Sequence, residues 1–217
     1  GRVDGGANAV IDAMLDAVGP SGTVIVPTLS FGVLKESPVR FSVRDTPSST
    51  GYVTEVLRKR PEARRSLHPV SSTAAIGAQA EHLTSGHLGS PCDETSPYYR
   101  LAKAGGKVVF LGAPLHSNSL FHCAEDIVLP EYLGFATFEA EVEDANGKMH
   151  KVTRTRYDCA DRGIPRHIRK MEPVFLKKGL LREARIGDSR TCLIKGMQNI
   201  DACCEVLRER PEYILEE

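Results

Sequence analysis

The 217-residue sequence lacks a long apolar run, a surplus of charge of one sign and a secretory leader. No segment approaches the roughly 20 apolar residues that a membrane-spanning helix needs. The first ten residues lack the basic and apolar regions of a signal peptide. Lysine plus arginine number 28, as do aspartate plus glutamate, so no global field would recruit nucleic acid or an anionic membrane. We therefore expect a soluble cytoplasmic protein with neither as partner.

Paired cysteine motifs are also absent. The six cysteines show no CxxC spacing; they are Cys92, Cys123, Cys159, Cys192, Cys203 and Cys204. This usage is typical of reduced thiols in a cytosolic protein. No His, Asp or Glu spacing resembles a metal site. We therefore expect neither zinc nor another metal.

Several well-known catalytic motifs are missing as well. The sequence has no GxxxxGK and no strand-linked GxGxxG, so nucleotide hydrolysis and hydride transfer lose their main support. It has no GxSxG elbow, which argues against a serine hydrolase. There is no internal repeat. The function has to be sought in smaller clusters of polar residues.

What is present is an α/β pattern in a chain that is 41% apolar and 26% charged, the composition of one globular domain. Apolar periodicity predicts helices over residues 7–18, 50–60, 78–83, 96–104, 172–181 and 199–210, and strands over 22–27, 73–76 and 107–111. Leu29–Ser49 predicts a long surface loop overhanging a site. Thr137–Arg156 alternates around Asn146-Gly147, which predicts an inserted antiparallel hairpin. The opening helix–strand order predicts an earlier N-terminal strand that this sequence lacks.

The segment Lys107–Glu125 is the first candidate site. An apolar strand leads through a Gly-Ala-Pro break and a polar turn to a helix start that carries His122 and Glu125. Loops at strand ends in α/β sheets commonly bind ligands. A histidine with a carboxylate three residues on, along one helix face, has the parts of a general base. The alternative is a helix-start histidine that is merely capped or solvated.

Two further turns carry candidate binding groups. Ala63–Gly77 packs two arginines, a histidine and several hydroxyl residues between a helix and a strand, groups that suit phosphate binding. Asp93 and Glu94, followed by Tyr98, form an acidic turn with aromatic neighbours that suits a polycationic ligand. The alternative for each turn is a solvated surface segment with no binding role.

The order of these motifs resembles the aminoglycoside 3-N-acetyltransferase family of antibiotic acetyltransferases. The matching motifs are Arg65-Ser66-Leu67-His68-Pro69, a Ser-Pro helix start at Ser96 and His122-Cys123-Ala124-Glu125. The resemblance extends from Gly5 to about Gly187. It implies a mixed α/β sandwich with helices on both faces, distinct from the common N-acetyltransferase fold, and a single acetyltransferase domain over residues 1–217.

The resemblance also implies the chemistry. An amine of the substrate attacks acetyl-coenzyme A directly, and His122 removes the proton, oriented by Glu125 or Glu172, with Asp161 as a third candidate. The donors for the developing oxyanion would be Thr28, Ser30 and Asn118, or nearby backbone amides. The coenzyme-binding residues it implies are Thr28, Arg65, Ser66, His68, Ser71 and Asn118. Asp93, Glu94 and Tyr98 would face the cationic sugar.

Three hypotheses follow from the resemblance. The first is acetyl-coenzyme A-dependent acetylation of the 3-amino group of aminoglycosides, with the protein as monomer or homodimer. The second is an acyltransferase acting on another amine, which the balanced charge favours because a polycationic substrate is best met by an acidic protein. The third is a non-catalytic relative, suggested by the missing strand.

Overall fold

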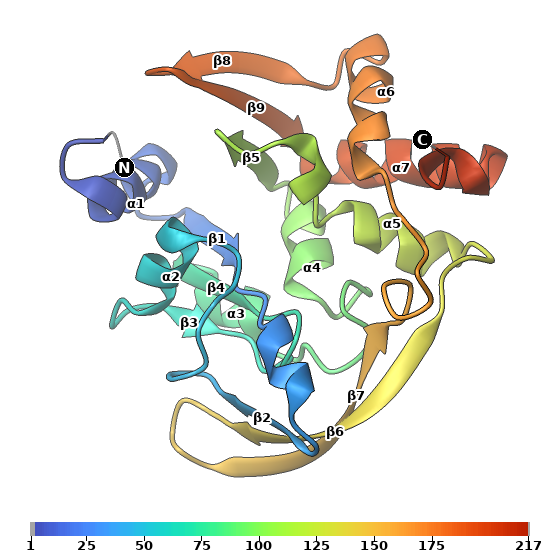
Figure 1. Cartoon of the computed structure of the whole chain (residues 1–217). Helices are drawn as coiled ribbons and strands as arrows, with labels where there is room; N and C mark the ends of the chain where they lie inside the picture. Colours follow the sequence, from blue (N-terminus) through green and yellow to red (C-terminus); the bar gives the residue numbers. More distant parts are fainter. Residues whose placement is uncertain (1–2, 217) are drawn as a thin grey trace. The chain divides into compact units, whose positions relative to one another are not determined.

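The computed structural model describes residues 3–216 (Figure 1). Contacts divide it into two compact units. Unit 1 holds the residues up to Pro91 together with Thr95–Pro97 and Thr137–Arg156. Unit 2 holds Cys92–Glu94, Tyr98–Ala136 and the residues from Tyr157 onward. The described part of the chain combines helices with three small sheets of three strands each, which confirms the mixed α/β class.

In unit 1 the first sheet has the order β1-β4-β3 and lies beside α1, α2 and α3 (Figure 1). The bounds are α1 Gly6–Val18, β1 Thr23–Pro27, α2 Tyr52–Arg58, β3 Arg64–Arg65, β4 Thr73–Gly77 and α3 Ala80–Thr84. Strands β1 and β4 are antiparallel, with Thr23 opposite Gly77. A Cβ at Gly77 would lie 2.2 Å from the Gly22 carbonyl oxygen, so only glycine permits this close strand end. Ile11 and Leu57, both fully buried, join the helices to the sheet.

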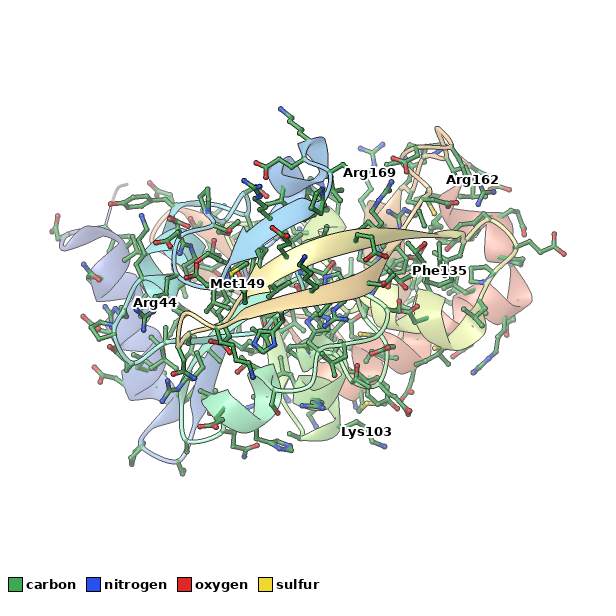
Figure 2. All side chains as sticks on the ribbon, turned by 90° about the horizontal axis from the view of Figure 1, so that it is seen from below. Arg44, Lys103, Phe135, Met149, Arg162 and Arg169 are labelled. Atoms are coloured by element: carbon green, nitrogen blue, oxygen red, sulfur yellow. The ribbon has the colours of Figure 1, made fainter. Side chains whose placement is uncertain are left out.

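The second sheet has the order β2-β6-β7. Its strands are β2 (Val39–Ser42), β6 (Phe135–Glu143) and β7 (Met149–Tyr157), the last two running side by side in Figure 2. The Asp144 side chain accepts hydrogen bonds from the backbone amides of Asn146 and Lys148, and Gly147 has a φ of 79°. This Asx turn explains why the predicted Asn-Gly site reverses the chain.

The prediction of a long loop over Leu29–Ser49 is wrong in part. The segment contains a 3₁₀ helix, η1 (Phe31–Lys35), and strand β2, which pairs parallel with β6. Val39 and Phe41 of β2 are buried against Val142 of β6. A four-residue strand carries too little periodicity to be seen in sequence, and its partner lies about a hundred residues away.

Unit 2 is built on the sheet β5-β9-β8 and a group of helices (Figure 1). The bounds are α4 Pro97–Lys103, β5 Lys107–Leu111, η2 Leu115–Ser117, α5 Phe121–Val128, η3 Ile168–Lys170, α6 Met171–Lys177, β8 Arg182–Ile186, β9 Ser189–Lys195, α7 Gly196–Glu209 and η4 Pro211–Ile214, where η marks a 3₁₀ helix. Helix α7 packs along α5. Phe121, Phe175 and Ile194 are fully buried in the core of this unit.

The predicted helices and the three predicted strands are present, with ends shifted by a few residues. Sequence reasoning missed β3, β8 and β9. Strand β8 is exposed along its whole length, so it lacks an apolar face, but the two-residue Gly187-Asp188 connection was an available hairpin signal. Strand β5 pairs antiparallel with β9, so the parallel-sheet argument for a site at its end does not apply. Among residues 3–216, no helix is long and apolar enough to cross a bilayer.

Candidate active site

Helix α5 positions the first candidate residues. Its buried side chains Phe121, Cys123 and Ala124 pack into the core of unit 2 and fix the rotation of the helix. That rotation leaves the His122 side chain 23% exposed, while Glu125 is fully buried one turn further on. The i,i+3 spacing therefore places one partner at the surface and the other beneath it.

His122 and Glu125 form a hydrogen-bonded pair. The imidazole Nδ1 lies 2.5 Å from Oε2 of Glu125, so Nδ1–H donates to the carboxylate. The neutral ring then carries its lone pair on Nε2, which has no hydrogen-bond partner among the described residues. A ring oriented in this way can accept a proton at Nε2.

The Glu125 carboxylate is held at both oxygens. The Tyr132 hydroxyl donates to Oε1 at 2.8 Å, and Nη1 of Arg166 donates to Oε2 at 3.1 Å. Burial by itself would raise the pKa of Glu125, but His122, Arg166 and Tyr132 together lower it below its ordinary value. The carboxylate therefore stays ionised although it is buried. Burial and the neighbouring carboxylate raise the pKa of Tyr132, so its hydroxyl remains a donor.

Tyr157 completes this cluster. Its ring centroid lies 5.5 Å from that of His122, and the Arg166 guanidinium stands 5.8 Å from the Tyr157 ring centroid. The Tyr157 hydroxyl donates to Oδ2 of Asp126 at 2.6 Å. Sequence reasoning missed Tyr157 and Arg166 because they reach α5 from 31 or more residues away, and it missed Tyr132, seven residues after Glu125, because it belongs to no motif.

The structure discriminates between the carboxylates proposed to orient His122. Glu172, in α6, is 2.6 Å from Nη2 of Arg190 and makes no contact with His122 among the described residues. Asp161 is exposed in the loop that follows β7. Glu125 is therefore the carboxylate that the fold brings to the imidazole.

Arg65 lies in a buried network in unit 1. Its Nε donates to the hydroxyls of Thr28 and Ser72, and Nη2 donates to the Thr28 carbonyl and to Oγ of Ser30. Nη1 donates to two further backbone carbonyls, one of them 2.6 Å away at Thr46. Burial and the Arg58 charge lower the pKa of Arg65 to about 9. The guanidinium thus ties the β1 end to the following loops, and its predicted role toward the coenzyme stays a prediction.

Two histidines of unit 1, His68 and His87, are buried and bonded at both ring nitrogens. His68 accepts from the Ser71 amide at Nδ1 and donates from Nε2 to the Thr155 carbonyl at 3.1 Å. His87 accepts from Oγ of Ser66 at 3.1 Å and donates from Nε2 to the Pro91 carbonyl. The two rings are 4.8 Å apart. The Arg-Ser-x-His-Pro motif therefore builds a packed, hydrogen-bonded cluster.

The remaining predicted residues are dispersed. Asn118 and Asn199 exchange side-chain amide hydrogen bonds of 2.9 and 3.0 Å, both fully buried, and so join the start of α5 to α7. Tyr98 is buried in the core of unit 2, Asp93 is half-buried and Glu94 is exposed. Within residues 3–216, no group of three or more His, Cys, Asp or Glu side chains is placed to hold a metal.

The chain is thus an α/β protein whose candidate site is a carboxylate-held imidazole, the equipment of an acid–base enzyme. The model of the aminoglycoside 3-N-acetyltransferase family matches residues 1–208. A relative from a Salmonella species, aminoglycoside N(3)-acetyltransferase III, is 32% identical over 92% of this chain and 78% of its own length. A similar enzyme of Streptomyces fradiae, type VIII, is 33% identical over 76% of this chain and 63% of its own length.

Two solved structures of aminoglycoside acetyltransferases have a similar fold. That of the aminoglycoside acetyltransferase AAC(3)-Xa superposes with a TM-score of 0.83 at 29% identity, covering 100% of this chain and 84% of its own. The AAC-IIIb structure, a binary complex with CoASH, superposes with a TM-score of 0.84 at 26% identity, covering 97% and 86%. The chain belongs to the aminoglycoside 3-N-acetyltransferase family and is an acetyltransferase.

Proposed function

We propose that this protein transfers the acetyl group of acetyl-coenzyme A to the 3-amino group of an aminoglycoside, with His122 as general base. The observation that carries the proposal is the pair of His122 and the buried, ionised Glu125. The substrate class comes from the names of its relatives. The cosubstrate is supported by the solved relative with CoASH.

The proposed reaction is a direct transfer of the acetyl group from sulfur to nitrogen. The acceptor amine attacks the thioester carbonyl carbon, a C–N bond forms, the C–S bond breaks and the coenzyme leaves as its thiolate. The amine proton passes to Nε2 of His122, the ring nitrogen that the Glu125 contact leaves open. The negative charge of Glu125 stabilises the imidazolium formed in that transfer.

The other predicted assignments are not used in this step. The roles of Thr28, Arg65, Ser66, His68 and Ser71 toward the coenzyme stay predictions. So do that of Asn118 toward the coenzyme and the substrate-side roles of Asp93, Glu94 and Tyr98. The single domain and the sandwich arrangement implied by the resemblance also stay predictions.

The test is an acetylation assay with His122→Ala and a matched control, His150→Ala. His150 also pairs with a carboxylate, Asp144, at 2.8 Å, but in the β6–β7 turn. We expect His122→Ala to lower kcat/KM at least about 100-fold, the lower end of general-base contributions. The control should retain wild-type turnover, and both variants should keep the wild-type circular dichroism spectrum.

The acceptor is tested separately with the wild-type protein. A panel of aminoglycosides and unrelated amines, read by mass of the product, distinguishes the proposed substrate from another amine. Acetylation of unrelated amines alone would replace the aminoglycoside assignment. No heat on mixing with coenzyme A in a calorimeter would favour a non-catalytic relative, and unchanged turnover in His122→Ala would remove the proposed base.

A further inference from the structure

We propose that Arg166 is a positioning residue for this reaction, because it neutralises Glu125 so that His122 does not have to. The inference rests on the proposed function. Arg166 lies in the loop between β7 and η3, 41 residues from Glu125 in sequence. Its side chain is 19% exposed, and its Nη1 is 3.1 Å from Oε2 of Glu125 and 3.4 Å from Nδ1 of His122.

Nη1 of Arg166 and Nδ1 of His122 share one acceptor. Arginine has only donors, and the neutral imidazole donates from Nδ1 in this arrangement, so the two nitrogens do not bond each other. Both point at Oε2 of Glu125, while the Tyr132 hydroxyl takes Oε1. Hydrogen bonds to both oxygens therefore fix the orientation of the Glu125 carboxylate.

The charges around Glu125 give Arg166 its particular role. A fully buried carboxylate needs a compensating positive charge. Two groups near it can supply one: Arg166, which is always protonated, and His122 in its imidazolium form. With Arg166 in place, part of the compensation comes from a permanent charge 3.1 Å from Oε2, so less of it has to come from an imidazolium at His122.

The other titratable groups facing this cluster do not supply that charge. They are Tyr132, Tyr157, Asp126 and Cys203. Each is neutral or negative. Without Arg166, the imidazolium form of His122 would be the remaining cation beside Glu125, and protonated His122 has no base function.

The backbone around Arg166 is anchored. Pro165, directly before Arg166, has its φ fixed by its ring, and the amide of His167 donates to the Ile214 carbonyl at 2.7 Å. The Tyr213 hydroxyl donates to the Lys170 carbonyl at 3.1 Å. The loop that presents Arg166 is therefore fastened to the 3₁₀ helix η4 near the end of the chain.

The test compares Arg166→Gln, Arg166→Lys and a control, Arg162→Gln. Arg162 lies in the same loop, where Figure 2 labels it, is 43% exposed and pairs with Asp158. The pH dependence of kcat/KM is measured for each with an acceptor that the wild type acetylates. We expect Arg166→Gln to raise the pH at which kcat/KM falls on the acid side by about one unit, and so to lower kcat/KM at pH 7 about threefold or more, with KM changed less than about twofold.

In Arg166→Lys, the fall of kcat/KM at low pH should return most of the way to the wild-type pH. Arg162→Gln should have the wild-type pH profile. A loss in Arg166→Gln by the same factor at every pH would mean a merely structural role and would overturn the inference. So would an unchanged profile.

A second measurement is independent of turnover. Nitrogen-15 spectra of the His122 ring report its tautomer and its protonation with pH. In Arg166→Gln we expect the imidazolium form to persist to higher pH than in the wild type. If the wild type acetylates nothing, the proposed function fails, while this spectrum still supports or overturns the role of Arg166. An identical titration of the His122 ring in the wild type and in Arg166→Gln would overturn the proposed role of Arg166.

Discussion

Two histidines of unit 1, His68 and His87, differ from His122 of unit 2 in how their ring nitrogens are used. In unit 1, His68 and His87 are buried, their rings are 4.8 Å apart and both nitrogens of each make hydrogen bonds. In unit 2, His122 is partly exposed and uses one nitrogen, on an ionised carboxylate. In the first arrangement, both nitrogens of each ring are occupied by hydrogen bonds within a packed core. The second leaves a basic nitrogen available.

The difference lies in the partners of the ring nitrogens. The ring nitrogens of His68 and His87 bond to backbone groups and to the Ser66 hydroxyl. His122 faces Glu125, whose charge would stabilise the proton that His122 takes up in the proposed reaction. The useful criterion is thus the partner of each ring nitrogen, and the presence of a histidine in a recognisable motif is a weaker one.

The strongest way to break this contrast is Glu125→Gln. The amide keeps the size of the side chain but removes its charge, so neither the tautomer of His122 nor its imidazolium is supported. We expect kcat to fall at least about 100-fold. Steady-state kinetics at pH 7 checks this. A variant that retains wild-type kcat would show that the pair is structural.

The same variant has a pH signature in stability. The pKa of Glu125 is lowered in the folded protein, so its contribution is present above the ordinary value of 4.5 and is lost as the pH falls through the lower folded value. Denaturant unfolding from pH 6 to pH 3 should show a steeper loss of stability in the wild type than in Glu125→Gln, in which the other carboxylates still titrate. Parallel curves for the two proteins would contradict the ionised state of Glu125.

Ser66→Ala tests the packed side of the contrast. Oγ of Ser66 donates to Nδ1 of His87 and accepts from the Thr73 amide, both buried. We expect the apparent free energy of unfolding to fall by about 1–3 kcal/mol because both partners lose their hydrogen bond. Ser49→Ala is the control, since Ser49 donates to the Leu29 carbonyl from an exposed position. Equal losses in the two variants would argue against a specific role of the buried network.

The smallest expected effect is that of Glu172→Gln. Glu172 pairs at the surface with Arg190 and not with His122. An exposed ion pair contributes about 0–1 kcal/mol, so stability should change within that range, and kcat should change less than about twofold. The measurement is kcat of Glu172→Gln and of Glu125→Gln under the same conditions. A larger loss of kcat in Glu172→Gln would transfer the orienting role to Glu172.

The helices and strands β1, β4 and β5 were predictable from local apolar patterns, and β6 and β7 from the alternation of apolar and polar residues around a turn signal. Helix α1 was visible in its apolar spacing, and the turn before β7 in Asn146-Gly147. Strands β2 and β8 were not, because each owes its structure to a pairing partner. His122 and Glu125 were predictable as a pair because they share one helix turn.

By itself, the sequence determined the α/β class, the absence of common nucleotide and hydrolase motifs, and the spacing that unites His122 with Glu125. These depend on neighbours along the chain, which periodicity and spacing describe. Only the tertiary structure decided that Glu172 pairs elsewhere, that His68 and Arg65 are engaged in buried networks, and that Arg166 meets Glu125. Burial and charge at those positions come from segments up to 87 residues apart, and no local pattern contains them.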